Sequence, residues 1–304
     1  MPNWKEVLDE LKVEAQNGNS NAIDTVRRKY LAQISNKTGR NTIAYYSGWL
    51  QNKNPSDTSI NDRDKNAFMV CIHKLDRKKG LDLILHTPGG DLAATESIVD
   101  YLFSMFGKDV RAIIPQISMS AGTMIALSCK SIVMGKQSNL GPIDPQMGGI
   151  ACQGILSEFD SAINDLKVRP WSAPLWQSII GKYHPTLLGA CQKAIEWSDK
   201  LVEEWLMRNM CNGDKTITEK ILKDLGSHEN NKSHARHISK EKCKELGLNI
   251  VDMEEDNDLQ DLILTTHHAF MHTFSSTLAS KVVENHLGIA YIEMSQNIQT
   301  PIKR

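Results

Sequence analysis

Two serines precede a run of small residues that is typical of a short helix. Ser118 and Ser120 come before the stretch 121–127, Ala-Gly-Thr-Met-Ile-Ala-Leu. A serine hydroxyl at the start of a helix lies close to backbone N–H groups that have no partner within the helix, and these groups favour a developing negative charge. Serine is also a preferred helix cap, which is the purely structural interpretation. The pattern therefore indicates either nucleophilic chemistry or only a helix start.

A Pro-Gly-Gly turn closes a strand-like run earlier in the chain. The apolar run Leu81–His86 is followed by the turn Thr87–Gly90, which contains two consecutive glycines. Because glycine has no Cβ, the backbone N–H groups of such a turn can face outward and approach a ligand closely. On its own the turn is more typical of a strand-to-helix connection. A third segment, Ser138–Gln146, is a loop rich in glycine and proline.

Strand-like and helical segments alternate around these turns, and the strands and helices must hold the turns in place. The expected strands are Leu81–His86, Val110–Pro115 and Ser131–Met134, and the expected helices between them are Leu92–Phe106 and Ala121–Leu127. Alternation at this spacing predicts right-handed crossovers and a largely parallel sheet in an α/β fold. Ligands of such sheets bind at the carboxyl ends of the strands, where the three segments converge.

Helical spacing also marks both ends of the chain. Apolar residues recur at helical intervals in 1–35, in the long tract Pro185–Met210 and in the tail Leu259–Asn285. We therefore expect a helical N-terminal arm at 1–40, an α/β domain at 41–255 and a C-terminal helical extension at 256–304.

Together the three segments resemble a known group of enzymes. The matching stretches are Leu85–Gly90, Ser118–Ser128 and Leu140–Gln146. In this order they resemble the Clp-peptidase/crotonase superfamily. Within it the chain is most similar to the serine dehydrogenase proteinase family, which is related to signal peptide peptidase A. The resemblance covers residues 40–250.

The resemblance implies a Clp/crotonase-type core, with a parallel β-sheet flanked by helices. It implies an ATP-independent serine endopeptidase that acts on a peptide or protein, forms a homo-oligomer and uses no cofactor. Ser120 takes the place of the nucleophile, because Ser118 lies further from the helix start. The backbone N–H groups of Gly90 and Ala121 take the place of the oxyanion hole, which stabilises the tetrahedral intermediate of acyl transfer.

Several residues are candidates for the base that takes the proton from the serine. Clp peptidases carry a histidine before a Gly-Gly turn, but Asp144 stands near that place here, so a Ser-His-Asp triad is not expected. The signal-peptide-peptidase-A branch resembles a Ser-Lys arrangement, whose lysine is deprotonated by burial. We favour Lys182, just before the long helical tract, over Lys167. His184 in the same turn and His86 at a strand end are further candidates.

The sequence around the remaining histidines favours structural roles for them. His234 and His237 lie in a polar stretch that is more typical of a surface loop than of a proton shuttle. His268 and His272 stand four apart on a predicted helix, as a metal-binding pair does, but no third ligand has suitable spacing. We therefore expect no metal site.

Composition excludes several other classes of protein. The formal net charge is −1, with 35 Lys and Arg against 36 Asp and Glu, which argues against a nucleic-acid partner. No apolar run is long enough for a membrane span, and the six cysteines are far apart. We expect a cytoplasmic protein, since the N-terminal residues do not have the pattern of a secretory signal. Two alternatives to a peptidase stay open: an inactive peptide- or protein-binding member of the fold, and a crotonase-like enzyme acting on acyl thioesters.

Overall fold

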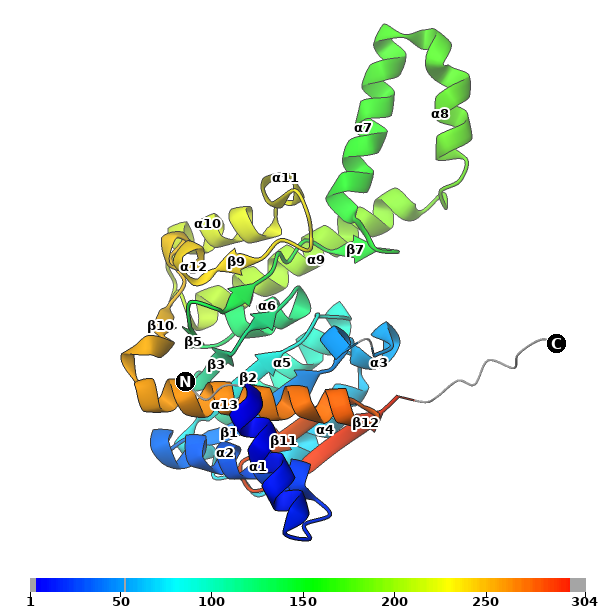
Figure 1. Cartoon of the computed structure of the whole chain (residues 1–304). Coiled ribbons are helices and arrows are strands. Elements are labelled where there is room, and N and C mark those ends of the chain that lie inside the picture. Colours follow the sequence, from blue (N-terminus) through cyan, green and yellow to red (C-terminus); the bar gives the residue numbers. More distant parts are fainter. Residues whose placement is uncertain (1–3, 52, 296–304) are drawn as a thin grey trace, which may run out of the picture.

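A mostly parallel sheet forms the centre of the molecule (Figure 1). The computed structural model describes residues 4–51 and 53–295, and within them seven strands form this sheet in the order β10-β5-β3-β2-β1-β11-β12. Their bounds are β1 Asn41–Ser47, β2 Leu81–His86, β3 Val110–Ile114, β5 Ser131–Met134, β10 Ile250–Asp252, β11 Ala279–Asn285 and β12 Ala290–Met294.

The strands from β10 to β1 run parallel, whereas β11 and β12 are added antiparallel at the other edge. Ala44 of β1 lies opposite Ile84 of β2 and, on its other side, opposite Glu284 of β11. Every residue of β1, β2 and β11 is buried, as expected for strands that are covered on both faces. The α/β fold with a largely parallel sheet is therefore confirmed.

One face of the sheet is covered by helices. These helices are α4 Arg63–Ile72, α5 Leu92–Phe106, α6 Ala121–Leu127, α9 Leu187–Arg208, α10 Lys215–Gly226 and α12 Lys240–Leu246. Of these, α5, α6 and α9 also border the site described below. Leu83 and Leu85 of β2 point to this face and pack with Phe68, Ile98 and Met124 in the larger hydrophobic core.

The opposite face is covered by α2 Ala22–Thr38 and α13 Asn257–Ser276, with α1 Trp4–Gln16 packed across both. Ile84 of β2 points to this side, where it shares a second core with Ile34 of α2 and Phe270 of α13. Side chains of a strand alternate between the two faces, so His86 is on this side of the sheet as well. That alternation decides which residues of the Leu81–Gly90 segment can reach the site.

Two helices project from the body of the molecule (Figure 1). They are α7 Cys152–Val168 and α8 Ala173–Ile180, which continue into α9. Val168, Trp171 and Leu175 in this projection are mostly exposed. None of the helices in the described part of the chain is long and apolar enough to cross a membrane.

The remaining elements are short connections. They are η1 Trp49–Gln51, α3 Pro55–Thr58, η2 Arg77–Lys79, β4 Ile117–Ser118, β6 Asn139–Leu140, β7 Gln146–Met147, β8 Ile150–Ala151, η3 Pro170–Ser172, α11 His228–Asn231, β9 Ile238–Ser239 and η4 Met253–Glu255.

The C-terminal tail differs from the helix predicted for Leu259–Asn285. The helix α13 ends at Ser276, and Ala279–Asn285 is the fully buried strand β11. The sequence did not indicate a buried strand here, because the segment contains Lys281 and Glu284. These two charged residues are buried by ion pairing rather than exposed on a helix face. Within its described part, residues 256–295, the predicted C-terminal extension 256–304 therefore supplies two strands of the central sheet and is not wholly helical. The division at residues 40 and 255 stays a prediction.

Candidate active site

Ser120 occupies a strained turn between β4 and α6. Its φ is 51° and its ψ is −119°, in a region that residues other than glycine rarely adopt. Although Ser120 immediately precedes α6, its side chain makes no capping hydrogen bond to the helix. The residue is half-buried and lines a cavity, whereas Ser118 is fully buried and does not line it. Of the two serines, only Ser120 presents its side chain at this cavity.

Gly89 packs directly against the serine turn. A Cβ built on Gly89 would lie 2.7 Å from Ser120 Cβ and 2.8 Å from the Met119 carbonyl oxygen, and its φ is +97°. The Met119 N–H also donates to the Thr87 carbonyl oxygen at 2.9 Å. Only glycine allows this approach. The double-glycine turn and the serine turn are therefore held together as one unit.

The backbone N–H groups of Gly90 and Ala121 lie beside Ser120 and are not used by the neighbouring backbone. Ile60 donates from its N–H to the Gly89 carbonyl at 2.8 Å, and its carbonyl accepts from the Asp91 N–H at 2.9 Å. In this parallel bridge between Ile60 and Gly90, the N–H of Gly90 points away from Ile60. Ala121 begins α6, so its N–H has no acceptor within the helix. Both residues line the cavity beside Ser120.

The cavity beside Ser120 has a volume of about 420 Å³ and is lined by both polar and apolar residues. Its apolar residues include Leu92 of α5, Met124 of α6 and Trp197 of α9, together with Ile143 of the loop after β6. A second cavity of about 760 Å³ adjoins it, since Pro88, Gln146 and His234 line both. The two cavities therefore form one extended hollow, and Ser120 lines the smaller of them.

The loop after β6 brings a carboxylate to this region. Thr123 of α6 donates from Oγ1 to the Ser118 carbonyl at 2.9 Å and accepts from the Gly141 N–H at 2.9 Å, which ties the loop to the serine turn. Asp144 follows in the loop and is only 1% exposed.

Two histidines bind the Asp144 carboxylate. His234 Nδ1 lies 2.8 Å from Asp144 Oδ1, and His228 Nδ1 lies 3.2 Å from Asp144 Oδ2. An ionised carboxylate only accepts hydrogen bonds, so Nδ1 is the donor in both contacts and Nε2 is the ring nitrogen that Asp144 does not engage. His234 lines the Ser120 cavity, whereas His228 lines only the adjoining one. His234 is thus the imidazole that shares a cavity with the serine.

The lysines favoured by the sequence lie elsewhere in this structure. Lys182 is exposed in the turn between α8 and α9, and it does not line the Ser120 cavity. Lys167 is exposed near the end of α7, with its Nζ 3.5 Å from Asn164 Oδ1. His184 is exposed and bonds Thr186 Oγ1 at 2.9 Å. The chain does not bring these candidate bases to Ser120.

His86 is fully buried on the α13 side of the sheet. Its ring centroid lies 4.3 Å from that of Trp49 and 5.1 Å from that of His267, and His86 does not line the Ser120 cavity. Burial holds the pKa of His86 well below its ordinary value, and the neighbouring His267 lowers it further. His86 is therefore a neutral core residue of the aromatic cluster.

His234 is the functional candidate that the sequence interpretation missed. The stretch around it is polar and irregular, as in a surface loop, and Asp144 lies 90 residues away along the chain. The one available signal was Asp144 itself, a carboxylate between two prolines in a loop of otherwise apolar and small residues. A buried carboxylate needs partners. Within the described residues, no group of three or more His, Cys, Asp or Glu side chains is arranged to hold a metal ion.

Comparison with known proteins is consistent with this geometry. A family model described as ClpP-like SDH-type serine proteinase matches residues 21–269. An uncharacterized protein of Methanocaldococcus jannaschii is 35% identical over 101 residues, which cover 33% of this chain and 35% of that protein. A second uncharacterized protein of the same organism is 30% identical over 191 residues, which cover 63% of this chain and 59% of that protein. The chain thus spans less than two thirds of each relative.

Proposed function

The chain belongs to the family of ClpP-like SDH-type serine proteinases, and from this membership we propose that it hydrolyses peptide bonds with Ser120 as the nucleophile. The observation that carries the proposal is one shared cavity, lined by Ser120, Gly90, Ala121 and His234. Each of these residues supplies a different part of an acyl-transfer reaction.

Ser120 attacks the carbonyl carbon of the scissile peptide, and the carbonyl oxygen becomes an oxyanion. The N–H groups of Gly90 and Ala121 donate to that oxygen. They are fixed before the reaction by the Ile60 bridge and by α6, so no reorganisation is needed when the charge develops. Each such donor accounts for a factor of about 10²–10³ in rate in well-studied hydrolases.

We propose His234 as the general base. Its Nε2 lone pair takes the proton from Ser120 Oγ and then gives it to the leaving amine, while Asp144 fixes the tautomer through the 2.8 Å bond to Nδ1. Water then hydrolyses the acyl-enzyme with the same base. Lys182, the base favoured from the sequence, stays a rival prediction, although its side chain is exposed and does not line the Ser120 cavity.

The substrate is proposed to be an extended peptide with an apolar side chain beside the scissile bond. Leu92, Met124, Ile143 and Trp197 provide the apolar walls that would receive that side chain. The reaction consumes only peptide and water, so we also propose that it is independent of ATP and of any cofactor.

Assembly into a homo-oligomer is proposed from the projection formed by α7 and α8 (Figure 1). Val168 and Trp171 are each 76% exposed there and Leu175 is 62% exposed. Large apolar side chains gathered on a projection are typical of a protein–protein contact.

Hydrolysis of an unfolded protein substrate tests the proposed function. The wild-type chain should cut it without added nucleotide, and Ser120→Ala should bind it without cutting, with an unchanged circular dichroism spectrum. His234→Ala should be nearly inactive and Lys182→Ala should be active. A wild-type chain that binds peptides and never cuts them would instead be the inactive, peptide-binding member of the fold.

A further inference from the structure

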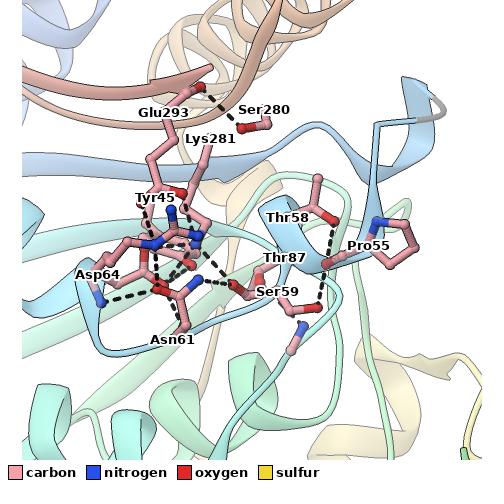
Figure 2. Close-up of polar contacts among 12 residues, drawn as sticks. Tyr45, Pro55, Thr58, Ser59, Asn61, Asp64, Thr87, Ser280, Lys281 and Glu293 are labelled. Atoms are coloured by element: carbon pink, nitrogen blue, oxygen red, sulfur yellow. Dashed lines mark hydrogen bonds and ion pairs between the residues drawn. The ribbon is translucent and has the colours of Figure 1, made fainter. Parts of the chain in front are cut away.

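A buried ion pair lies behind the oxyanion hole, on the antiparallel edge of the sheet (Figure 2). Lys281 of β11 is 1% exposed and Asp64 of α4 is fully buried. Lys281 Nζ lies 2.8 Å from Asp64 Oδ1 and 3.0 Å from Oδ2. The Tyr45 hydroxyl of β1 donates to Asp64 Oδ2 at 2.9 Å. The pair therefore joins β11, α4 and β1 at one point.

The same two side chains hold a short connecting segment, residues 59–61. Lys281 Nζ donates to the Ser59 carbonyl oxygen at 2.9 Å, and Asp64 Oδ2 accepts from the Asn61 N–H at 2.9 Å. Figure 2 shows Ser59 and Asn61 on either side of the pair, each joined to it by a dashed line. Both ends of the segment are therefore fixed by charged groups.

The residue in the middle of this segment orients the double-glycine turn. Ile60 makes the two backbone hydrogen bonds to Gly89 and Asp91 described above. A Cβ on Gly90 would lie 2.3 Å from both Ile60 N and Ile60 O, so the two backbones are in direct contact. The direction of the Gly90 N–H thus depends on where Ile60 is held.

We propose that Lys281 and Asp64 are positioning residues for the oxyanion hole. By fixing Ser59 and Asn61 they hold Ile60, and Ile60 holds Gly90 so that its N–H points at the substrate oxygen. Neither side chain touches the substrate, and the proposal rests on the proposed serine peptidase activity. Ser59 also lines the Ser120 cavity, so the path from the ion pair to the site is short.

Removing Lys281 leaves the Asp64 carboxylate buried without its cation, which is destabilising by itself. A test must therefore separate a loss of stability from a misplaced N–H group. The chain offers a matched control in Arg27 of α2, whose Nε lies 2.7 Å from Glu284 Oε2, with both side chains fully buried. That pair also joins a helix to β11, and it makes no hydrogen bond to residues 59–61 or 89–91.

The experiment compares Lys281→Met with Arg27→Met at a temperature where both are folded. Lys281→Met should lower kcat for a peptide substrate by about 10-fold or more, because one donor of the oxyanion hole is displaced, with KM changed by less than about 2-fold. Arg27→Met should keep kcat within about 2-fold of wild type. If Lys281→Met does not fold, the double variant Lys281→Met/Asp64→Leu removes both charges and takes its place.

Hydrogen exchange gives a second readout that does not need activity. The Asp91 N–H, which donates to Ile60, should exchange faster in Lys281→Met than in Arg27→Met. Wild-type kcat and wild-type exchange of Asp91 in a folded Lys281→Met chain would overturn the proposal. A wild-type chain with no peptidase activity would instead overturn the proposed function, and the exchange comparison would still decide whether the pair holds the turn.

Discussion

His234 Nδ1 lies 2.8 Å from Asp144 Oδ1, although the two residues are 90 positions apart in the sequence. The carboxylate is buried and the imidazole faces the cavity that Ser120 lines. In the proposed mechanism, this arrangement supplies the serine with a base whose tautomer is fixed by a charged acceptor. It also explains why the loop after β6 carries an aspartate at a buried position, where an unpaired carboxylate would be destabilising.

Replacing His234 should remove most of the activity. We expect His234→Ala to lower kcat/KM for a peptide substrate by about 10²–10⁴-fold, the contribution of a well-placed general base. The measurement is steady-state hydrolysis of a fluorogenic peptide.

His228→Ala is the matched control, because His228 binds the other oxygen of the same carboxylate and lies outside the Ser120 cavity. It should reduce kcat/KM far less than His234→Ala. An equal loss in both variants would assign the histidines a common structural role, and a larger loss in Lys182→Ala would restore the Ser-Lys prediction.

The contact between Gly89 and Ser120 predicts a steric effect. In Gly89→Ala the new methyl group would meet Ser120 Cβ at 2.7 Å and push the serine turn away from the double-glycine turn. A displacement of about 1 Å at a reacting centre can cost about 10²-fold in rate, so we expect a loss of at least that size. Ester hydrolysis and thermal unfolding would be measured on the same preparation.

Gly39→Ala provides the comparison, since Gly39 also has a positive φ, of +68°, but no atom lies within 4 Å of its Cβ position. It should lose only about 1–2 kcal/mol of folding free energy, from the left-handed backbone, and keep its activity. Full activity in Gly89→Ala would contradict the close packing of the two turns.

Mild acid should destabilise the fold through its buried histidines. Burial lowers the pKa of His267 to about 3 and holds that of His86 well below 6.5. Both groups regain a pKa near 6.5 in the unfolded chain, so below that pH the unfolded state binds more protons than the folded state. The free energy of unfolding should therefore keep its full value above about pH 6.5 and decrease at lower pH. The decrease should be up to about 1.4 kcal/mol per pH unit for each histidine.

Urea unfolding at about pH 7.5 and about pH 5.5 measures this dependence. His267→Phe should flatten it, because one titrating group is removed, whereas the exposed His184→Ala should leave it unchanged. The same slope in His267→Phe as in wild type would show that His267 is not buried as a neutral group.

The projection predicts self-association. The mass in solution, measured by light scattering, should be a multiple of the 34.1 kDa of a single chain. Replacing the exposed Trp171 and Leu175 together with serine should lower that mass while the far-ultraviolet circular dichroism stays the same, because neither side chain belongs to the hydrophobic core. A single-chain mass for the wild type would contradict the homo-oligomer.

The sequence was sufficient for the inner strands of the parallel sheet, β2, β3 and β5, and for the helices between them. The bounds of β2, β5, α5 and α6 agree with the segments predicted from apolar runs and turn residues. Such strands are buried on both faces and read as continuous apolar runs. The match of residues 21–269 to the ClpP-like SDH-type family confirms the family resemblance drawn from the three motifs.

The antiparallel edge and the Asp144–His234 contact were not predictable in the same way. β11 contains Lys281 and Glu284, whose burial depends on partners far away in the sequence, and no local period reveals such pairs. The contact of His234 with Asp144 has no local signal either, because α7, α9 and α10 lie between the two residues in the chain. Local patterns located the glycine and serine turns, whereas the groups that meet them came from long-range packing.

The most direct test of the account is to identify the residue that reacts with a fluorophosphonate probe, by mass spectrometry of the labelled chain. The account predicts a single adduct on Ser120, no adduct on the buried Ser118, and no labelling of Ser120→Ala. An adduct on a different serine, or undiminished labelling of Ser120→Ala, would contradict it.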